Sequence, residues 1–271
     1  EIYSKKLFVH LHCHDISQFT NIYDYYIYDL SKYFHIVVTY SIGYLDKQYN
    51  HITILKIPNN GLDIGAKMLM VKYLKDKDIT YDYIYFMHSK NDKNLRQIYF
   101  DTLFDNMDNI VSNIYNYEGY FPNLVYKLFK QYNIKMINQT KNVDFNYNYT
   151  TELKHYLNVK DPQMNTFIEG NVYILKNNIC DTIFGDERLY PLLNETDEND
   201  YVYLQNIYKR SLEEIFNKFK HNFQTKMIHD GQIEHAFERT VLSLCNSFYI
   251  AKPLLTVIIK NGELIPHILE Q

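Results

Sequence analysis

The stretch Tyr81–Asp92, YDYIYFMHSKND, is a run of apolar and aromatic side chains that passes directly into histidine, serine, lysine and aspartate. Short, nearly continuous apolar runs are typical of strands buried on both faces of a parallel sheet. The segment IVVTY at 36–40 has the same character. Both segments are therefore predicted to be strands of a parallel sheet, and the first presents polar side chains where it ends.

Strand and helix patterns alternate around these two segments. Strands are predicted at 6–13, 35–41, 51–58 and 81–89, and helices at 17–34, 61–77 and 92–116. After an asparagine-rich passage at 138–162 come a predicted strand at 166–176, a helix at 230–245 and a hairpin at 254–267. This alternation predicts an α/β fold with a Rossmann-type, mostly parallel sheet flanked by helices.

Composition disfavours several classes of function. The 271 residues are 46% hydrophobic, enough for a substantial core, and the formal net charge of −4 provides no basic surface for nucleic acid. No apolar run approaches the roughly 20 residues of a membrane span, and the first residues lack a signal-peptide layout. Cys13, Cys180 and Cys245 are far apart, which favours reduced thiols. We expect a cytoplasmic protein that has no membrane span and binds no nucleic acid; the oligomeric state is left open.

Polar segments follow three of the predicted strands. Ligands of open α/β sheets bind in the crevice beyond the carboxyl ends of the strands. The segments 12–15, 59–65 and 88–92 are therefore expected to border one crevice.

The first of these segments belongs to HLHCHD, in which His10, His12 and His14 alternate and would share one face of a strand. Three interpretations stay open: a zinc site, hydrogen bonding of His12 or His14 to a substrate, and plain packing of the imidazoles. The spacing of about 6–7 Å between alternate side chains is long for a single metal shell. No metal site is predicted here.

The second segment, NNGLDIG at 59–65, carries two of the eight glycines of the chain. Glycine permits a sharp turn from strand to helix, and the N-terminus of the helix attracts anions. Asp63 would either hydrogen-bond a sugar hydroxyl or cap the helix that it opens.

Four segments in order carry a family resemblance: NNGLDIG at 59–65, YFMHSKND at 85–92 followed by Arg96, EGNVYIL at 169–175, and DGQIEHAFER at 230–239. Together they resemble the rhamnan synthesis protein F family of glycosyltransferase-like proteins, over roughly residues 7 to 240. Leu62, Asn91 and Tyr173 depart from the family pattern.

The resemblance implies a GT-A-like fold with a C-terminal acceptor-side extension. Residues 1–150 would form the nucleotide-sugar-binding half and 151–271 the acceptor-side, catalytic half of one continuous domain. The implied activity is transfer of a sugar, such as rhamnose or another deoxyhexose, from a nucleotide-diphosphate donor to a glycan acceptor.

Candidate roles follow from this chemistry. A carboxylate base must activate the acceptor hydroxyl if configuration inverts, and positive charge must stabilise the leaving diphosphate. Asp230 and Glu234 are the candidate bases, in that order, since their spacing places them on one helix face. The donor-binding candidates are Asn60, Gly61, Asp63, His88, Lys90, Arg96 and Arg239, and the acceptor- or sugar-binding candidates are His12, Glu169 and Gly170.

The end of the 81–89 strand bears on metal use. Sugar-nucleotide transferases on this kind of sheet commonly carry Asp-x-Asp there, which holds a divalent cation. This chain has His88-Ser89-Lys90, so Lys90 is predicted to neutralise the diphosphate without a required cation. If a cation is used, Asp92 is the candidate ligand.

Two alternatives remain beside the transferase. One is a catalytically inactive binding protein on a glycosyltransferase scaffold, because fold does not imply function. The other is a metal-dependent hydrolase that uses HLHCHD.

Overall fold

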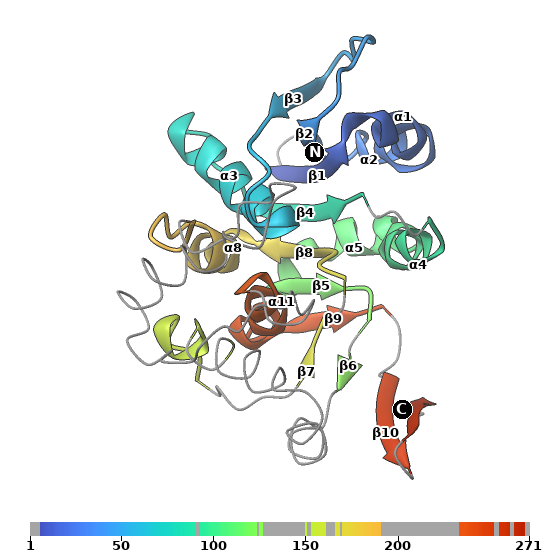
Figure 1. Ribbon diagram of the computed structural model, residues 1–271, viewed down its shortest axis with the longest axis vertical. Coiled ribbons are helices and arrows are strands. Elements are labelled where there is room, and N and C mark those ends of the chain that lie inside the picture. The colour runs from blue at the N-terminus through green and yellow to red at the C-terminus, as the bar shows by residue number, and fades with distance from the viewer. Residues whose placement is uncertain are drawn as a thin grey trace, which may run out of the picture.

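The computed structural model describes residues 6–89, 93–123, 125–126, 150, 153–160, 166–168, 170–190, 233–251, 255–260 and 263–268. Its main feature is a seven-stranded sheet in the order β3-β2-β1-β4-β8-β5-β9 (Figure 1). The strands are β1 (Leu7–Asp15), β2 (His35–Ile42), β3 (Ile52–Lys56), β4 (Tyr83–His88), β5 (Gly119–Phe121), β8 (Tyr173–Lys176) and β9 (Phe248–Ile250).

Strands β3, β2, β1 and β4 are mutually parallel, whereas β8 runs antiparallel to both β4 and β5. β9 pairs in parallel with β5. The prediction of an α/β fold with a mostly parallel sheet is confirmed. β8 and β9 come from the second half of the chain and belong to the same sheet, while the assignment of separate roles to the two halves stays a prediction.

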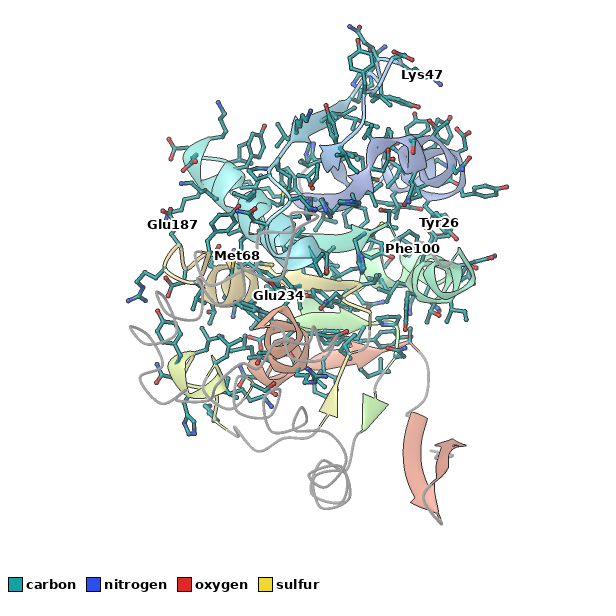
Figure 2. All side chains as sticks on the ribbon, in the orientation of Figure 1. Tyr26, Lys47, Met68, Phe100, Glu187 and Glu234 are labelled. Carbon is teal, nitrogen blue, oxygen red and sulfur yellow. The ribbon has the colours of Figure 1, made fainter. Side chains whose placement is uncertain are left out.

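Burial on both faces explains the apolar strands. Phe8 and Val37 face one hydrophobic core, and Val9 and Val38 face the other. The first core is covered by α3 (Leu62–Asp76), α8 (Asn177–Phe184) and α11 (Ile233–Leu244). Helices thus enclose the sheet on both sides, with Met68 of α3 on one side and Phe100 of the opposite layer on the other (Figure 2).

The opposite layer contains η2 (Ile16–Gln18), α1 (Phe19–Ile22), the π-helical turn η3 (Tyr23–Ile27) and α2 (Tyr28–Leu30). It continues with α4 (Lys93–Phe104), α5 (Met107–Ser112) and η4 (Ile114–Asn116). The helix predicted at 17–34 is confirmed in its main part, since residues 16–30 are one continuous helical run that passes through a π-helical turn. The helical segment predicted at 92–116 is divided by turns into α4, α5 and η4. Tyrosines of the π turn pack edge-on against other rings, such as Tyr26 against Phe100 at 5.2 Å between centroids.

The predicted strand at 166–176 is also two elements. β7 (Thr166–Phe167) belongs to a second sheet of order β11-β10-β6-β7, whereas β8 belongs to the main sheet. Between them Gly170 and Asn171 adopt left-handed backbone angles, with φ of 91° and 56°, which turn the chain from one sheet to the other.

The second sheet also contains β6 (Val125–Tyr126), β10 (Leu255–Lys260) and β11 (Glu263–Ile268). β10 and β11 form the predicted antiparallel hairpin. None of the helices in the described ranges combines the length and the apolar composition that a membrane span requires.

Candidate functional site

The candidate site lies at the carboxyl ends of β1 and β4, where α3 begins. Gly61 is the N-cap of α3 with a left-handed φ of 69°, and Asn60 precedes it. Asp63 lies in the first helical turn, so its carboxylate is stabilised by the helix dipole but does not cap the helix. The strand-to-helix turn at 59–65 thus directs the N-terminus of α3 toward the polar end of the sheet.

A buried ion pair joins Asp63 to Lys67 one helical turn further on, with 2.6 Å between Nζ and Oδ2. The Lys67 side chain is only 2% exposed and that of Asp63 is 12% exposed. The ammonium lies 5.0 Å from the ring centroid of Tyr173 and 5.9 Å from that of Phe86, within range of cation–π attraction. Burial alone would raise the pKa of Asp63, but Lys67, helped by His88, holds it well below its usual range.

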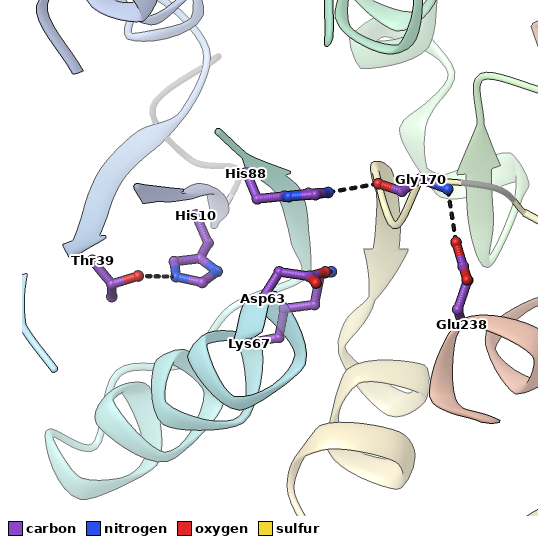
Figure 3. Close-up of polar contacts among 7 residues, drawn as sticks. All are labelled: His10, Thr39, Asp63, Lys67, His88, Gly170 and Glu238. Atoms are coloured by element: carbon purple, nitrogen blue, oxygen red, sulfur yellow. Dashed lines mark hydrogen bonds and ion pairs between the residues drawn. The ribbon is translucent and has the colours of Figure 1, made fainter. Parts of the chain in front are cut away.

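Two imidazoles of β1 share one hydroxyl of β2 beside this pair. The Thr39 Oγ1 atom lies 2.8 Å from His10 Nε2 and 3.0 Å from His12 Nδ1. Since the hydroxyl has a single proton, at least one of these imidazole nitrogens donates to it. Figure 3 shows His10 lying between Thr39 and the Asp63–Lys67 pair.

Both imidazoles are buried. Burial, reinforced by His12 and Lys67, lowers the pKa of His10 well below its usual value. Burial likewise lowers the pKa of His12 to about 4, although Asp63 opposes the effect. The two side chains are therefore uncharged at neutral pH and serve as hydrogen-bonding groups.

A backbone bridge links the end of β4 to α11. His88 Nε2 lies 2.7 Å from the carbonyl oxygen of Gly170, to which it donates, and the Gly170 N–H donates to Glu238 Oε1 over 2.8 Å (Figure 3). A Cβ atom at Gly170 would lie 2.7 Å from the Tyr99 ring, so glycine is required here by space as well as by its φ of 91°. Three of the segments that carry the family resemblance therefore meet at Gly170.

Among the predicted residues that the structure describes, Asn60 and Gly61 directly precede α3, and the others divide into three groups. Asp63 and His88 influence each other electrostatically, and His88 bonds Gly170, so these three lie together. His12, 5% exposed, bonds Thr39, and its predicted contact with a sugar stays a prediction. Glu234 and Arg239 are buried within α11, at 4% and 6% exposure.

The remaining predicted residues lie outside the described part of the chain: Lys90, Asp92, Glu169, Asp230 and the side chain of Arg96. Within the described residues no three or more His, Cys, Asp or Glu side chains are grouped to hold a metal ion.

Sequence patterns alone did not identify Lys67, Thr39 or the role of Glu238. The Asp63–Lys67 spacing is that of an ion pair on one helix face, so this pair could have been found. Thr39 required the register of β1 on β2, in which His12 pairs with Thr39. The sequence predicts that Glu238 and Arg239 form a pair that is either buried or faces the diphosphate, and this stays a prediction. The bond from the Gly170 N–H to the Glu238 carboxylate was not predicted.

Comparison with known proteins identifies no relative: no family model, no curated protein and no solved structure matches the chain. The resemblance to the rhamnan synthesis protein F family therefore stays a prediction from the four quoted segments.

The buried ion pair makes a clear energetic prediction. Lys67→Met leaves the Asp63 carboxylate buried without its cation, which should lower the free energy of unfolding by about 3–5 kcal/mol. Adding Asp63→Asn should recover much of this loss, because no charge then remains buried. Urea unfolding of both single variants and the double variant measures the coupling. Strict additivity of the two losses would contradict a direct pair.

The buried histidines predict a stability that depends on pH. Their folded pKa values lie below the unfolded value of about 6.5, so the unfolded chain binds more protons and stability is lost as pH falls from about 6.5 toward 4. Each imidazole contributes a slope of about 1.4 kcal/mol per pH unit. Asp63, whose folded pKa is depressed, adds its loss only below about pH 4.

In His12→Asn the amide can still reach Thr39, but one titrating imidazole is lost. The free energy of unfolding, measured in urea between pH 7 and 4.5, should therefore depend on pH with a slope smaller by the share of one proton. Thr182→Asn, at an exposed position of α8 that carries no titrating group, is the control and should keep the wild-type slope. An unchanged slope in His12→Asn would show that His12 is not the titrating group.

Proposed function

We propose that this protein is a glycosyltransferase that moves a hexose, with rhamnose and related deoxyhexoses as the first candidates, from a nucleotide-diphosphate donor to a glycan acceptor. The proposal rests on one observation above all. Asp63, His88, Gly170 and Glu238, from the four segments that resemble the rhamnan synthesis protein F family, lie in one polar cluster at the carboxyl edge of the sheet.

The fold supports this assignment. A seven-stranded, mostly parallel sheet flanked by helices is compatible with the GT-A arrangement. Ligands of such sheets bind beyond the carboxyl strand ends, and the N-terminus of α3 offers backbone N–H groups to an anion there. The diphosphate of a donor would occupy this position, next to Asn60 and Gly61.

The chemistry is divided among the predicted residues. Lys90 neutralises the leaving diphosphate, with Arg96 and Arg239 as further cations. Asp230 or Glu234 takes the proton of the acceptor hydroxyl. Donor binding does not require a divalent cation in this proposal, because an imidazole and an ammonium replace the carboxylates that would hold one.

A panel of nucleotide sugars, screened by thermal stabilisation and then by transfer to glycan acceptors, tests the proposal. Lys90→Ala should weaken donor binding by about 10- to 150-fold, the cost of one charge-assisted contact, while EDTA should change little. Lys77→Ala, an exposed lysine just after α3, is the matched control and should bind donor as wild type does.

Three outcomes would contradict the proposal in different ways. Absence of stabilisation by any nucleotide sugar would exclude a donor site. Donor binding without transfer or hydrolysis would favour the inactive binding protein. Strong loss of affinity in EDTA, with little loss in Lys90→Ala, would show that a cation holds the phosphates.

A further inference from the structure

A cavity lies at the edge of the main sheet opposite to the candidate site, where the parallel strands begin. It has a volume of about 510 Å³, within the range of small-molecule sites. Its lining comes from the starts of β1, β2 and β3 with the residues just before β1 and β3, and from Tyr73 of α3 and the turn between α3 and β4. The cavity is therefore separated from the candidate transferase site by the length of the strands.

The floor of this cavity, which we call the amino-edge pocket, is apolar. Phe8 and Val37 are buried on the α3 face of the sheet, and Tyr73 and Ile79 pack against the same core. The His35 imidazole lies over Phe8 with 5.1 Å between ring centroids. The two rings are tilted by 36° to each other, and together with Tyr73 they offer aromatic surface to a ring of the ligand.

The rim is polar and mostly basic. Lys6, His35 and His51 line it and are exposed, and Asp78 is the acidic side chain among the lining residues. Lys6 is held in place by contacts of its ammonium with the Thr80 hydroxyl and of its backbone N–H with Asp82. The N–H donors of the rim favour an anionic group on the ligand.

Two lining residues also have unusual backbones. His51 and Asp78 adopt left-handed φ angles of 68° and 53°, which are uncommon for residues other than glycine. At Asp78 this conformation ends α3 in the ordinary way for a helix C-terminus, whereas His51 lies just before β3. Here they fall on two separate loops that border the same cavity.

We propose that the amino-edge pocket binds a small aromatic anion, its ring on the floor at Phe8 and its acidic group at Lys6 and the rim imidazoles. This site is additional to the proposed transferase site and does not depend on it. The ligand class has two separable parts, an aromatic ring and a negative charge, and each can be tested alone.

Fluorescence titration with two probes separates the ring from the charge. The probes are 8-anilinonaphthalene-1-sulfonate, which is anionic, and N-phenyl-1-naphthylamine, which is not. The wild-type protein should bind the sulfonate saturably and more tightly than the neutral amine. Thr53→Tyr places a ring in the cavity. It should weaken binding of both probes by more than about tenfold, because the ring takes up the volume that either probe needs. Thr182→Tyr, on the exposed side of α8, is the matched control and should leave both unchanged.

The sign of the charge effects provides an independent test that does not rely on the bulky variant. Lys6→Ala should weaken binding of the sulfonate by about 2- to 5-fold, as expected for an exposed charge contact, and leave binding of the neutral amine unaffected. Asp78→Asn removes the negative charge of the rim and keeps a side chain that tolerates a left-handed backbone. It should therefore tighten binding of the sulfonate. Two results would overturn the proposal. One is tighter sulfonate binding in Lys6→Ala together with weaker sulfonate binding in Asp78→Asn. The other is sulfonate binding that neither Lys6→Ala nor Thr53→Tyr changes.

Discussion

The buried ion pair between Asp63 and Lys67 is the interaction on which the candidate site depends. Removing two charges from water is costly, and the cost is offset only if each charge keeps close partners. Lys67 meets this need with the Asp63 carboxylate and with the rings of Phe86 on β4 and Tyr173 on β8. One pair therefore ties α3 to two strands, and it places the N-terminus of α3 at the carboxyl edge of the sheet.

The Gly170 bridge extends this arrangement into the second half of the chain. His88 at the end of β4 bonds the Gly170 carbonyl, and Glu238 on α11 bonds its N–H. The peptide groups flanking a glycine are thus held by an imidazole and a carboxylate from elements far apart in sequence. His88, Gly170 and Glu238 are therefore held together by direct contact rather than by proximity along the chain.

Hydrophobic periodicity and the positions of the strand ends were enough to predict part of the fold and of the candidate site. The apolar runs of β1, β2 and β4 predicted the parallel strands, and the rule for strand ends brought Asp63 and His88 together. The three-residue strands β5 and β9 were not predicted, because so short a segment has no readable pattern. The burial of Lys67 was not predicted either, since a helical lysine is ordinarily solvated and its burial depends on Tyr173, which is distant along the chain.

The central claim is that a nucleotide-diphosphate ligand binds at the carboxyl edge of the sheet, over Asp63, His88 and Gly170. Amide chemical-shift mapping of the labelled protein, titrated with UDP and with dTDP, tests it most directly. The account predicts that the largest shifts fall on Gly61, Ser89 and Gly170. Two results would contradict it: saturable binding with the largest shifts at the amino edge, on Lys6 and Thr80, or no shifts with either nucleotide.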